Sequence, residues 1–251
     1  MDTVDILNKE FSMQDFTGDQ PYDEMLVRYK DIACNYARME NVIAVLSDLR
    51  TRSSYIYYGG FSQMLERGGR KREDKVSSIW EKELFGLMHQ DDLENKHWQE
   101  LCFYHFMKRQ PKRKRSDYYL ASKIRMMSCT GSYLSVLHRM FYVLLPSSDS
   151  LWLALCLYGP LTIELPSQCM IVNSVTGHVT ELEKQNSKKI LSARERQILT
   201  MIDKGLTSKE IARLLSISIN TVSRHRQEIL ANLQVKNSIE ACRIAKDLKL
   251  I

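Results

Sequence analysis

The sequence predicts an α+β N-terminal domain, an antiparallel sheet with helices, followed by an all-α C-terminal domain of four short helices. Three observations lead to this prediction. Three strand-like segments separated by turn residues lie between residues 118 and 158. Two helix-capping sequences begin at residues 192 and 207. The excess positive charge is confined to the last quarter of the chain, which indicates that this part has a separate role.

The composition is that of an ordinary globular chain. The 251 residues are 44% hydrophobic, and the longest apolar runs, Met140–Leu145 and Leu151–Tyr158, are far shorter than the ~20 residues of a membrane-spanning helix. The first ten residues hold three acidic side chains and one Lys, unlike a secretory signal. The six cysteines stand singly, which argues against a metal site or a disulfide framework. We expect a cytoplasmic protein with no membrane contact, no metal and no cofactor.

The net charge divides unevenly along the chain. Residues 188–251 hold 13 Lys and Arg against six Asp and Glu, a net charge of +7. The preceding 187 residues hold 23 basic and 24 acidic side chains, a net charge of −1. This asymmetry is typical of a chain of which one end binds a polyanion.

Residues 1–52 are predicted to hold one long amphipathic helix. Met1–Gln20 has no regular pattern. Between Pro21 and Arg50, apolar side chains recur at alternating spacings of four and three: Met25, Tyr29, Ile32, Tyr36, Met39, Ile43 and Leu46. Two interpretations are open. The helix packs on its own domain, or it pairs with its copy in a homodimer as a short coiled coil.

Residues 53–182 are predicted to form the sheet. Tyr55–Tyr58 is a first strand, and a helix capped by Asp91 or Asp92 extends through Phe106. The basic run Lys108–Arg115 ends this helix. We interpret it as a solvated loop, with an auxiliary contact to DNA or a partner as the second interpretation. Three long strands and a hairpin follow, at residues 118–127, 133–145, 151–158, 169–173 and 178–182, and the polar residues 183–190 are the expected linker.

Residues 191–251 are predicted to form four short helices joined by tight turns. Residues suited to helix N-termini recur along this segment: Ser192 with Glu195, Thr207 with Glu210, Ser218, and Asn237 with Glu240. Gly205 ends the first helix, and the second helix should turn Ile211, Leu214 and Leu215 inward. The second and third helices then form a helix-turn-helix, a motif that places its second helix in the major groove of DNA.

The third helix can be divided into two faces at 100° per residue. Its apolar side chains, Val222, Ile229 and Leu233, fall on one side and should face the core. Arg224 and Gln227 fall on the opposite side, with Asn220. Arg can bond guanine O6 and N7, and Gln can bond adenine N6 and N7, so this outer face suits base edges.

Four segments of the C-terminal domain resemble the LuxR/FixJ type of DNA-binding domain: Leu191–Leu199, Gly205–Ala212, Ile217–His225, and Leu233–Asn237 with Glu240 and Ala241. The resemblance covers about 60 residues and its motifs are highly specific. It implies that the fourth helix dimerises. It also implies that Ser223, Arg224 and Gln227 contact bases. The contacts to phosphates would come from Lys209, Thr221, His225 and Arg226. The family usually has Lys or Arg at the position of Ser223 and Arg at that of Ser238, so Arg224 is the candidate to supply the usual base contact.

The N-terminal domain resembles a PAS domain between about Ser53 and Leu161. The local motif is Leu87–Asp92, which is similar to the family's His-Pro-Asp-Asp segment with Gln90 at the Pro position. The order of a strand pair, a helical middle and three long strands also fits. The resemblance implies that the domain senses a ligand, a cofactor or a partner, without naming the effector.

Together these observations predict a one-component transcriptional regulator, a homodimer in which the N-terminal domain controls a DNA-binding domain. Its partners would be double-stranded DNA, RNA polymerase and an unidentified small-molecule or protein effector. Two alternatives stay open: region 4 of a sigma factor, which shares several motif positions but lacks a fourth helix, and a signalling module that contacts a partner protein. No nucleophile triad, phosphate loop or paired-carboxylate motif indicates an enzyme.

Overall fold

The computed structural model describes residues 3–65, 72–145, 148–182, 191–233, 235–247 and 250–251. The chain divides into two compact units, Met1–Leu182 and Glu183–Ile251, here called the N-terminal and C-terminal domains. The predicted linker, residues 183–190, lies outside the described residues. Within the described part of the chain, no helix has both the length and the apolar character needed to cross a membrane.

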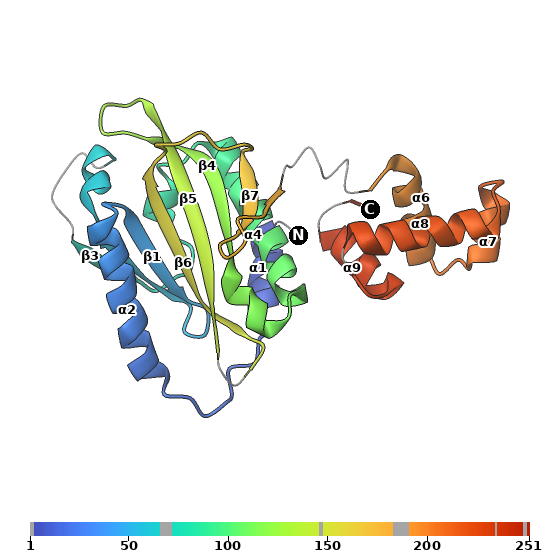
Figure 1. The fold of residues 1–251 in the computed structure, drawn as a ribbon, viewed down its shortest axis with the longest axis horizontal. Helices are drawn as coiled ribbons and strands as arrows, with labels where there is room; N and C mark the ends of the chain where they lie inside the picture. The colour runs from blue at the N-terminus through green and yellow to red at the C-terminus, as the bar shows by residue number, and fades with distance from the viewer. Residues whose placement is uncertain (1–2, 66–71, 146–147, 183–190, 234, 248–249) are drawn as a thin grey trace. The chain divides into compact units, whose positions relative to one another are not determined.

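An antiparallel sheet forms the centre of the N-terminal domain (Figure 1). In the described residues it has eight strands in the order β3-β2-β1-β6-β5-β4-β7-β8. Their bounds are β1 Ile43–Asp48, β2 Ser53–Tyr58, β3 Glu73–Val76, β4 Tyr118–Met127, β5 Tyr133–Leu144, β6 Leu151–Pro160, β7 Cys169–Asn173 and β8 Val179–Glu181. The predicted first strand, the three long strands and the hairpin are all present, whereas the sequence does not predict β1 and β3.

Helices cover both faces of this sheet (Figure 1). On one face, α2 (Tyr22–Met39) packs in a cluster with Leu155 and Phe141. On the other face, Phe103 of α4 (Gln90–Arg109) stacks on Tyr142 of β5, with ring centroids 5.5 Å apart. Phe141 and Tyr142 are neighbours in β5, and successive strand residues point to opposite faces. The sheet is therefore the middle of three layers. α3 (Lys82–Phe85) and two short 3-10 helices, η1 (Gly60–Met64) and η2 (Lys112–Asp117), lie in the connections between its strands.

The prediction of one helix from Met25 to Leu46 is wrong. α2 ends at Met39, Asn41 adopts a left-handed conformation with φ of 55°, and β1 begins at Ile43. Ile43 and Leu46 are buried in β1, between β2 and β6. They therefore take no part in a coiled coil, and residues 1–52 belong to the same sheet as the residues that follow.

The buried face of α2 is also rotated relative to the predicted one. Ala33 and Ala37 are buried, whereas Ile32 and Met39 are exposed. Small Ala side chains allow the helix to approach the sheet closely. A Cβ atom on Gly59 would lie 2.2 Å from the carbonyl oxygen of Ala37, so only glycine fits at this crossing. α2 thus packs on its own domain, the first of the two interpretations.

The N-terminal residues that lack a regular sequence pattern include a helix, α1 (Thr3–Ser12). Ile6, Leu7 and Phe11 are buried, and Phe11 meets Tyr104 of α4 edge-on with centroids 5.4 Å apart. A single short apolar patch is a weak local signal, and the packing on α4 stabilises this helix.

The basic run Lys108–Arg115 is only partly a solvated loop. Arg113 and Lys114 are exposed, but Arg115 is buried. Its guanidinium donates to the backbone carbonyls of Lys108, Gln110 and Asp149 at 3.2, 3.0 and 2.9 Å. Arg115 therefore joins the end of α4 to the segment before β6.

The motif Leu87–Asp92 attaches the start of α4 to β4. His89 is the N-cap of α4 and accepts from the backbone N–H of Asp91. Asp92 accepts two hydrogen bonds from the Arg125 guanidinium at 2.8 Å and one from the Arg125 backbone N–H at 2.7 Å. Partial burial alone would raise the pKa of Asp92, but these hydrogen bonds outweigh it and lower the pKa.

The C-terminal domain consists of α6 (Ala193–Asp203), α7 (Ser208–Leu214), α8 (Ile219–Asn232) and α9 (Ser238–Asp247). Both predicted capping boxes are present, at Ser192 with Glu195 and at Thr207 with Glu210. Asn237 accepts from the backbone N–H of Glu240 at 2.9 Å. The shared core contains the predicted apolar side chains of α8 and those of the other helices: Val222, Ile229, Leu233, Leu191, Ile198, Leu199, Ile211, Ala241 and Ile244. Leu214, which was expected to face the core, is exposed because α7 ends there.

We predict that Val222→Asp unfolds the C-terminal domain alone. An unpaired buried carboxylate should lower its free energy of unfolding by roughly 3–5 kcal/mol. All three Trp residues lie in the N-terminal domain, so tryptophan fluorescence should keep its melting transition while circular dichroism loses helix signal at low temperature. The matched control is Ser223→Asp, which places the same charge on the exposed next residue. Equal effects of the two variants would contradict the assignment of the two faces of α8.

Candidate nucleic-acid interface

The outer face of α8 is a row of exposed polar side chains. Asn220, Ser223, Arg224 and Gln227 are all exposed, and Val222 on the opposite side is completely buried. The helix begins after Ser218, whose Oγ accepts from the backbone N–H of Thr221 at 3.0 Å. The predicted division of α8 into two faces is therefore confirmed.

The carboxylate of Glu228 pairs with two basic side chains of the same helix. Its carboxylate accepts from Arg224 Nε at 3.0 Å and lies 3.1 Å from His225 Nδ1. The Arg224 side chain is 75% exposed and that of His225 only 19%. An exposed ion pair of this kind is weak, so Arg224 can exchange Glu228 for another acceptor at little cost.

Arg226 joins three helices. Its two guanidinium NH₂ groups donate to the Oγ atoms of Ser208, at the start of α7, and Ser238, at the start of α9, at 2.9 and 3.0 Å. The side chain is half-buried. Arg226 therefore fixes the N-terminal ends of α7 and α9 against the middle of α8.

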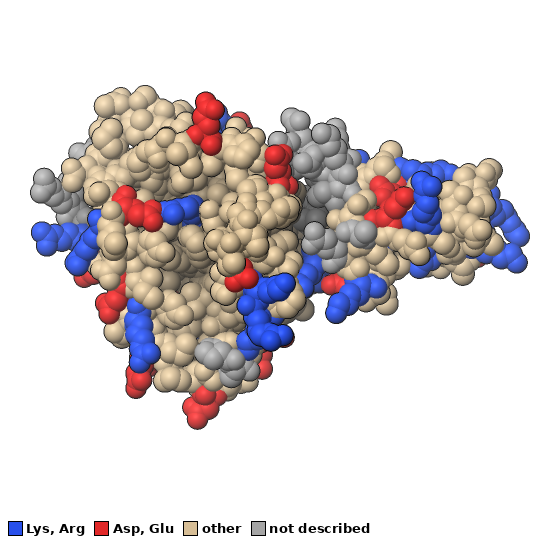
Figure 2. Space-filling model, viewed as in Figure 1, with Lys and Arg blue, Asp and Glu red and all other residues tan. Residues whose placement is uncertain are grey.

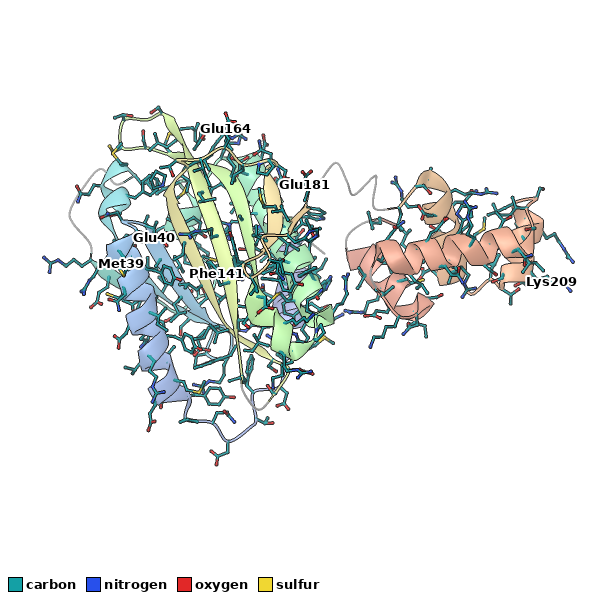
Figure 3. All side chains as sticks on the ribbon, in the orientation of Figure 1. Met39, Glu40, Phe141, Glu164, Glu181 and Lys209 are labelled. Atoms are coloured by element: carbon teal, nitrogen blue, oxygen red, sulfur yellow. The ribbon has the colours of Figure 1, made fainter. Side chains whose placement is uncertain are left out.

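Thr221 and Lys209 differ in solvent exposure and in hydrogen bonding. Thr221 is half-buried, and its hydroxyl lies 2.9 Å from that of Ser218. Lys209 is exposed in the first turn of α7, and Figure 3 shows its side chain pointing away from the domain. The neighbouring Glu210 accepts from the side chain and the backbone N–H of Thr207, which lowers its pKa.

Lys and Arg side chains are numerous on the visible face of the C-terminal domain, with fewer acidic ones among them (Figure 2). The structure thus brings Ser223, Arg224 and Gln227 to one exposed surface and leaves Lys209 extended from the helix before it. It gives Arg226 a second role that the sequence does not indicate, because Ser208 and Ser238 lie 18 and 12 residues away in the chain.

The N-terminal domain contains a second candidate site, a cavity of about 680 Å³ between β1, β2, β3 and residues 78–87. Apolar and aromatic side chains make up most of its wall, including Ile43, Ile56, Tyr58, Trp80, Leu84 and Leu87. Glu81, also in the wall, is buried, and burial raises its pKa although Ser54 Oγ donates to it at 2.6 Å. The sequence does not predict this cavity, because its lining comes from segments far apart in the chain.

Comparison with known proteins agrees with the geometry of the C-terminal domain. Residues 189–245 match the family described as bacterial regulatory proteins, luxR family. The domain is therefore a helix-turn-helix domain of the LuxR type, and the matched family is one of regulatory proteins.

Individual relatives match in the same region. YhjB of Escherichia coli (strain K12) is 49% identical over 53 residues, which are 21% of this chain and 26% of YhjB. The oxygen regulatory protein NreC of Staphylococcus haemolyticus (strain JCSC1435) is 32% identical over 95 residues, 37% of this chain and 44% of NreC. The chain thus spans less than half the length of either relative.

Some solved structures match over most of the chain, but weakly. A phage VqmA in complex with DPO is 13% identical, with 91% of each chain covered and a TM-score of 0.31. SdiA of Escherichia coli is 17% identical, with 99% of this chain and 97% of that chain covered and a TM-score of 0.25.

We predict that Arg226→Ala destabilises the C-terminal domain by about 1–3 kcal/mol, because it removes two hydrogen bonds from a charged group. Arg224→Ala is the matched control and should change the free energy of unfolding by less than about 0.5 kcal/mol. The measurement is the helical melting transition followed by circular dichroism. A domain that loses no stability in Arg226→Ala would contradict the joining role of this side chain.

Proposed function

We propose that this chain is a sequence-specific DNA-binding transcriptional regulator, in which α8 docks in the major groove of double-stranded DNA. The exposed polar face of α8, opposite the buried side chains of Val222 and Ile229, is the observation that supports this most directly. The net charge of +7 over residues 188–251 adds the attraction to phosphate that such docking requires.

Within this proposal, Arg224 and Gln227 contact base edges. Both are exposed on the outer face of α8, and both side chains can form bidentate pairs with bases. Ser223 adjoins them, but a hydroxyl discriminates little between bases. On docking, Arg224 exchanges its exposed ion pair with Glu228 for a base.

Phosphate contacts come from Lys209, Thr221 and His225. Lys209 extends from the helix that crosses the DNA backbone in this motif, and Thr221 lies in the first turn of α8. Arg226, also expected at a phosphate, contributes mainly by holding α7 and α9 on α8.

The regulator acts as a homodimer through α9, with RNA polymerase as the partner of the DNA-bound form. The match of residues 189–245 to the luxR family supports this role of α9, since the resemblance implies that the fourth helix dimerises. Ile239 of α9 is 85% exposed and so is accessible to another chain. The presence of α9 also favours this proposal over the sigma-factor alternative.

The N-terminal domain is proposed to be a PAS-like sensor of a small-molecule effector. A strand pair β1–β2, helices, and three long strands of which β6 returns to pair with β1 support the PAS-like assignment. The cavity of about 680 Å³ supports the effector, because ligand pockets are apolar clefts of about 300–1,000 Å³ with a few polar groups.

We predict different effects of Arg224→Ala and Lys209→Ala on DNA binding. Arg224→Ala should weaken the binding free energy for the preferred DNA sequence by about 1–3 kcal/mol and relax the preference at one base position. Lys209→Ala should weaken all sequences alike and reduce the slope of log affinity against log salt by about one unit. Selection from a random duplex pool, followed by salt titration, measures both effects.

The matched control for Lys209 is Lys246→Ala on α9, where Nζ pairs with Asp203 at 2.7 Å, and it should leave the salt slope unchanged. If Arg224→Ala kept the preferred sequence and Lys209→Ala altered it, the proposed docking would be incorrect. A folded protein with no salt-dependent DNA binding would favour the alternative of a protein-binding module.

We predict that compounds that bind the cavity raise the melting temperature of the N-terminal domain. Leu87 is half-exposed in the cavity wall, so Leu87→Trp should fill the space and abolish the rise. Tryptophan fluorescence during heating reports this domain. Compounds that stabilise Leu87→Trp as much as the unchanged protein would show that they bind elsewhere.

A further inference from the structure

A cluster of polar side chains lies buried between the sheet and α4. Lys96 and Glu100 come from α4, His138 from β5 and Cys156 from β6, and all four are buried. Lys96 Nζ forms an ion pair with Glu100 Oε1. Buried groups of this kind are costly without partners, so their convergence at one place requires an explanation.

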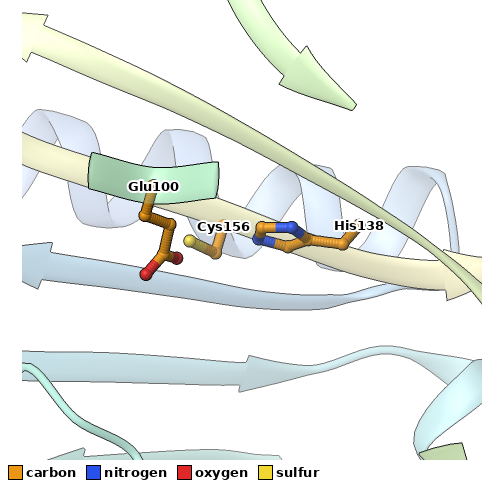
Figure 4. A group of neighbouring side chains, drawn as sticks. All are labelled: Glu100, His138 and Cys156. Carbon is orange, nitrogen blue, oxygen red and sulfur yellow. The ribbon is translucent and has the colours of Figure 1, made fainter. Parts of the chain in front are cut away.

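Three of these side chains converge on one point (Figure 4). The ligand-type atoms of Glu100, His138 and Cys156 all lie within 4.8 Å of one another. The sheet register produces this arrangement. His138 pairs across strands with Tyr158, and Cys156 is two residues from Tyr158 on the same face of β6. Glu100 reaches the pair from the helix packed on this face.

The hydrogen bonding of His138 leaves one ring nitrogen unused. Nδ1 lies 3.1 Å from Ser122 Oγ, whereas Nε2 is buried and has no hydrogen-bond partner among the described residues. A proton on Nδ1, donated to Ser122, leaves the Nε2 lone pair free. Metal-bound histidines commonly have their other ring nitrogen fixed in this manner.

We propose that Glu100, His138 and Cys156 form a binding site for a divalent first-row transition ion, of which Zn²⁺ is the best fit. Imidazole nitrogen, thiolate sulfur and carboxylate oxygen are the ligands that Zn²⁺ uses, usually in tetrahedral sites. Three protein ligands leave a fourth position for water. Mg²⁺ and Ca²⁺ prefer oxygen ligands alone and do not suit this set.

Space and charge at the site agree with a bound ion. A small cavity of about 30 Å³ is lined by Lys96, Glu100 and Cys156, and Trp80 and Glu81 line both it and the larger cavity. A bound ion would displace the thiol proton of Cys156. Its charge and that of Lys96 would then face the Cys156 thiolate and the Glu100 carboxylate, with Glu81 in the wall of the same cavity. A carboxylate has two oxygens, so Glu100 can bind Lys96 and an ion together.

The test is metal binding by the full chain after chelation and dialysis. Zn²⁺ should bind at one ion per chain and raise the melting temperature of the N-terminal domain, whereas Mg²⁺ should have no effect. Co²⁺ in the same site should give a thiolate-to-metal charge-transfer band in the near ultraviolet. Cys156→Ser should abolish that band. Ser122→Ala should weaken Zn²⁺ binding about 10- to 100-fold, because Ser122 is the hydrogen-bond partner that orients His138.

Cys34→Ser is the matched control, because Cys34 is half-buried in α2 on the other face of the sheet, and it should bind both ions normally. A Co²⁺-loaded wild-type protein without the charge-transfer band would overturn the proposal, whether or not the variants fold. Zn²⁺ binding that persists in Cys156→Ser and in Glu100→Gln would overturn it as well. The measurement needs no DNA, so its outcome is separate from that of the proposed function.

Discussion

The rotation of α8 about its own axis is fixed by three buried side chains, Val222, Ile229 and Leu233. A turn of the helix by one residue is about 100°, and it would expose this apolar row and bury charged groups. Packing thus determines which side chains α8 presents to solvent. Arg226 and the Ser218 cap fix the helix along its length and at its start. The function proposed for the chain depends on this constraint, because base recognition requires side chains held in a defined direction.

Structural features that depend on residues only a few positions apart could be predicted from the sequence. The capping boxes at Ser192 and Thr207 involve partners three residues away, and the strands β4, β5 and β6 are long apolar segments between turn residues. In contrast, the helical spacing of Ile43 and Leu46 was misleading, because the central position of β1 in the sheet outweighs a local pattern. The buried face of α2 likewise depends on the close approach at Gly59, which follows β2 and is 22 residues from Ala37 in the chain.

The candidate sites likewise differ in whether they are formed by local or by distant residues of the chain. The exposed face of α8 could be predicted, since it follows from helix periodicity alone. The cavity and the Glu100, His138 and Cys156 cluster could not, because their residues come together only through the strand register. One signal was available. His138 lies between Val136 and Met140 on the buried face of β5, and a titratable side chain at such a position of a predicted strand indicates a polar group in the core.

The most direct test of the docking of α8 is methylation interference on a duplex selected by the full chain. Dimethyl sulfate methylates guanine N7 in the major groove and adenine N3 in the minor groove, the groups that each groove exposes. The proposed docking predicts that N7 methylation at guanines of the selected site prevents binding, while N3 methylation has little effect. Interference from adenine N3 alone, with binding tolerant of N7 methylation throughout the site, would contradict it.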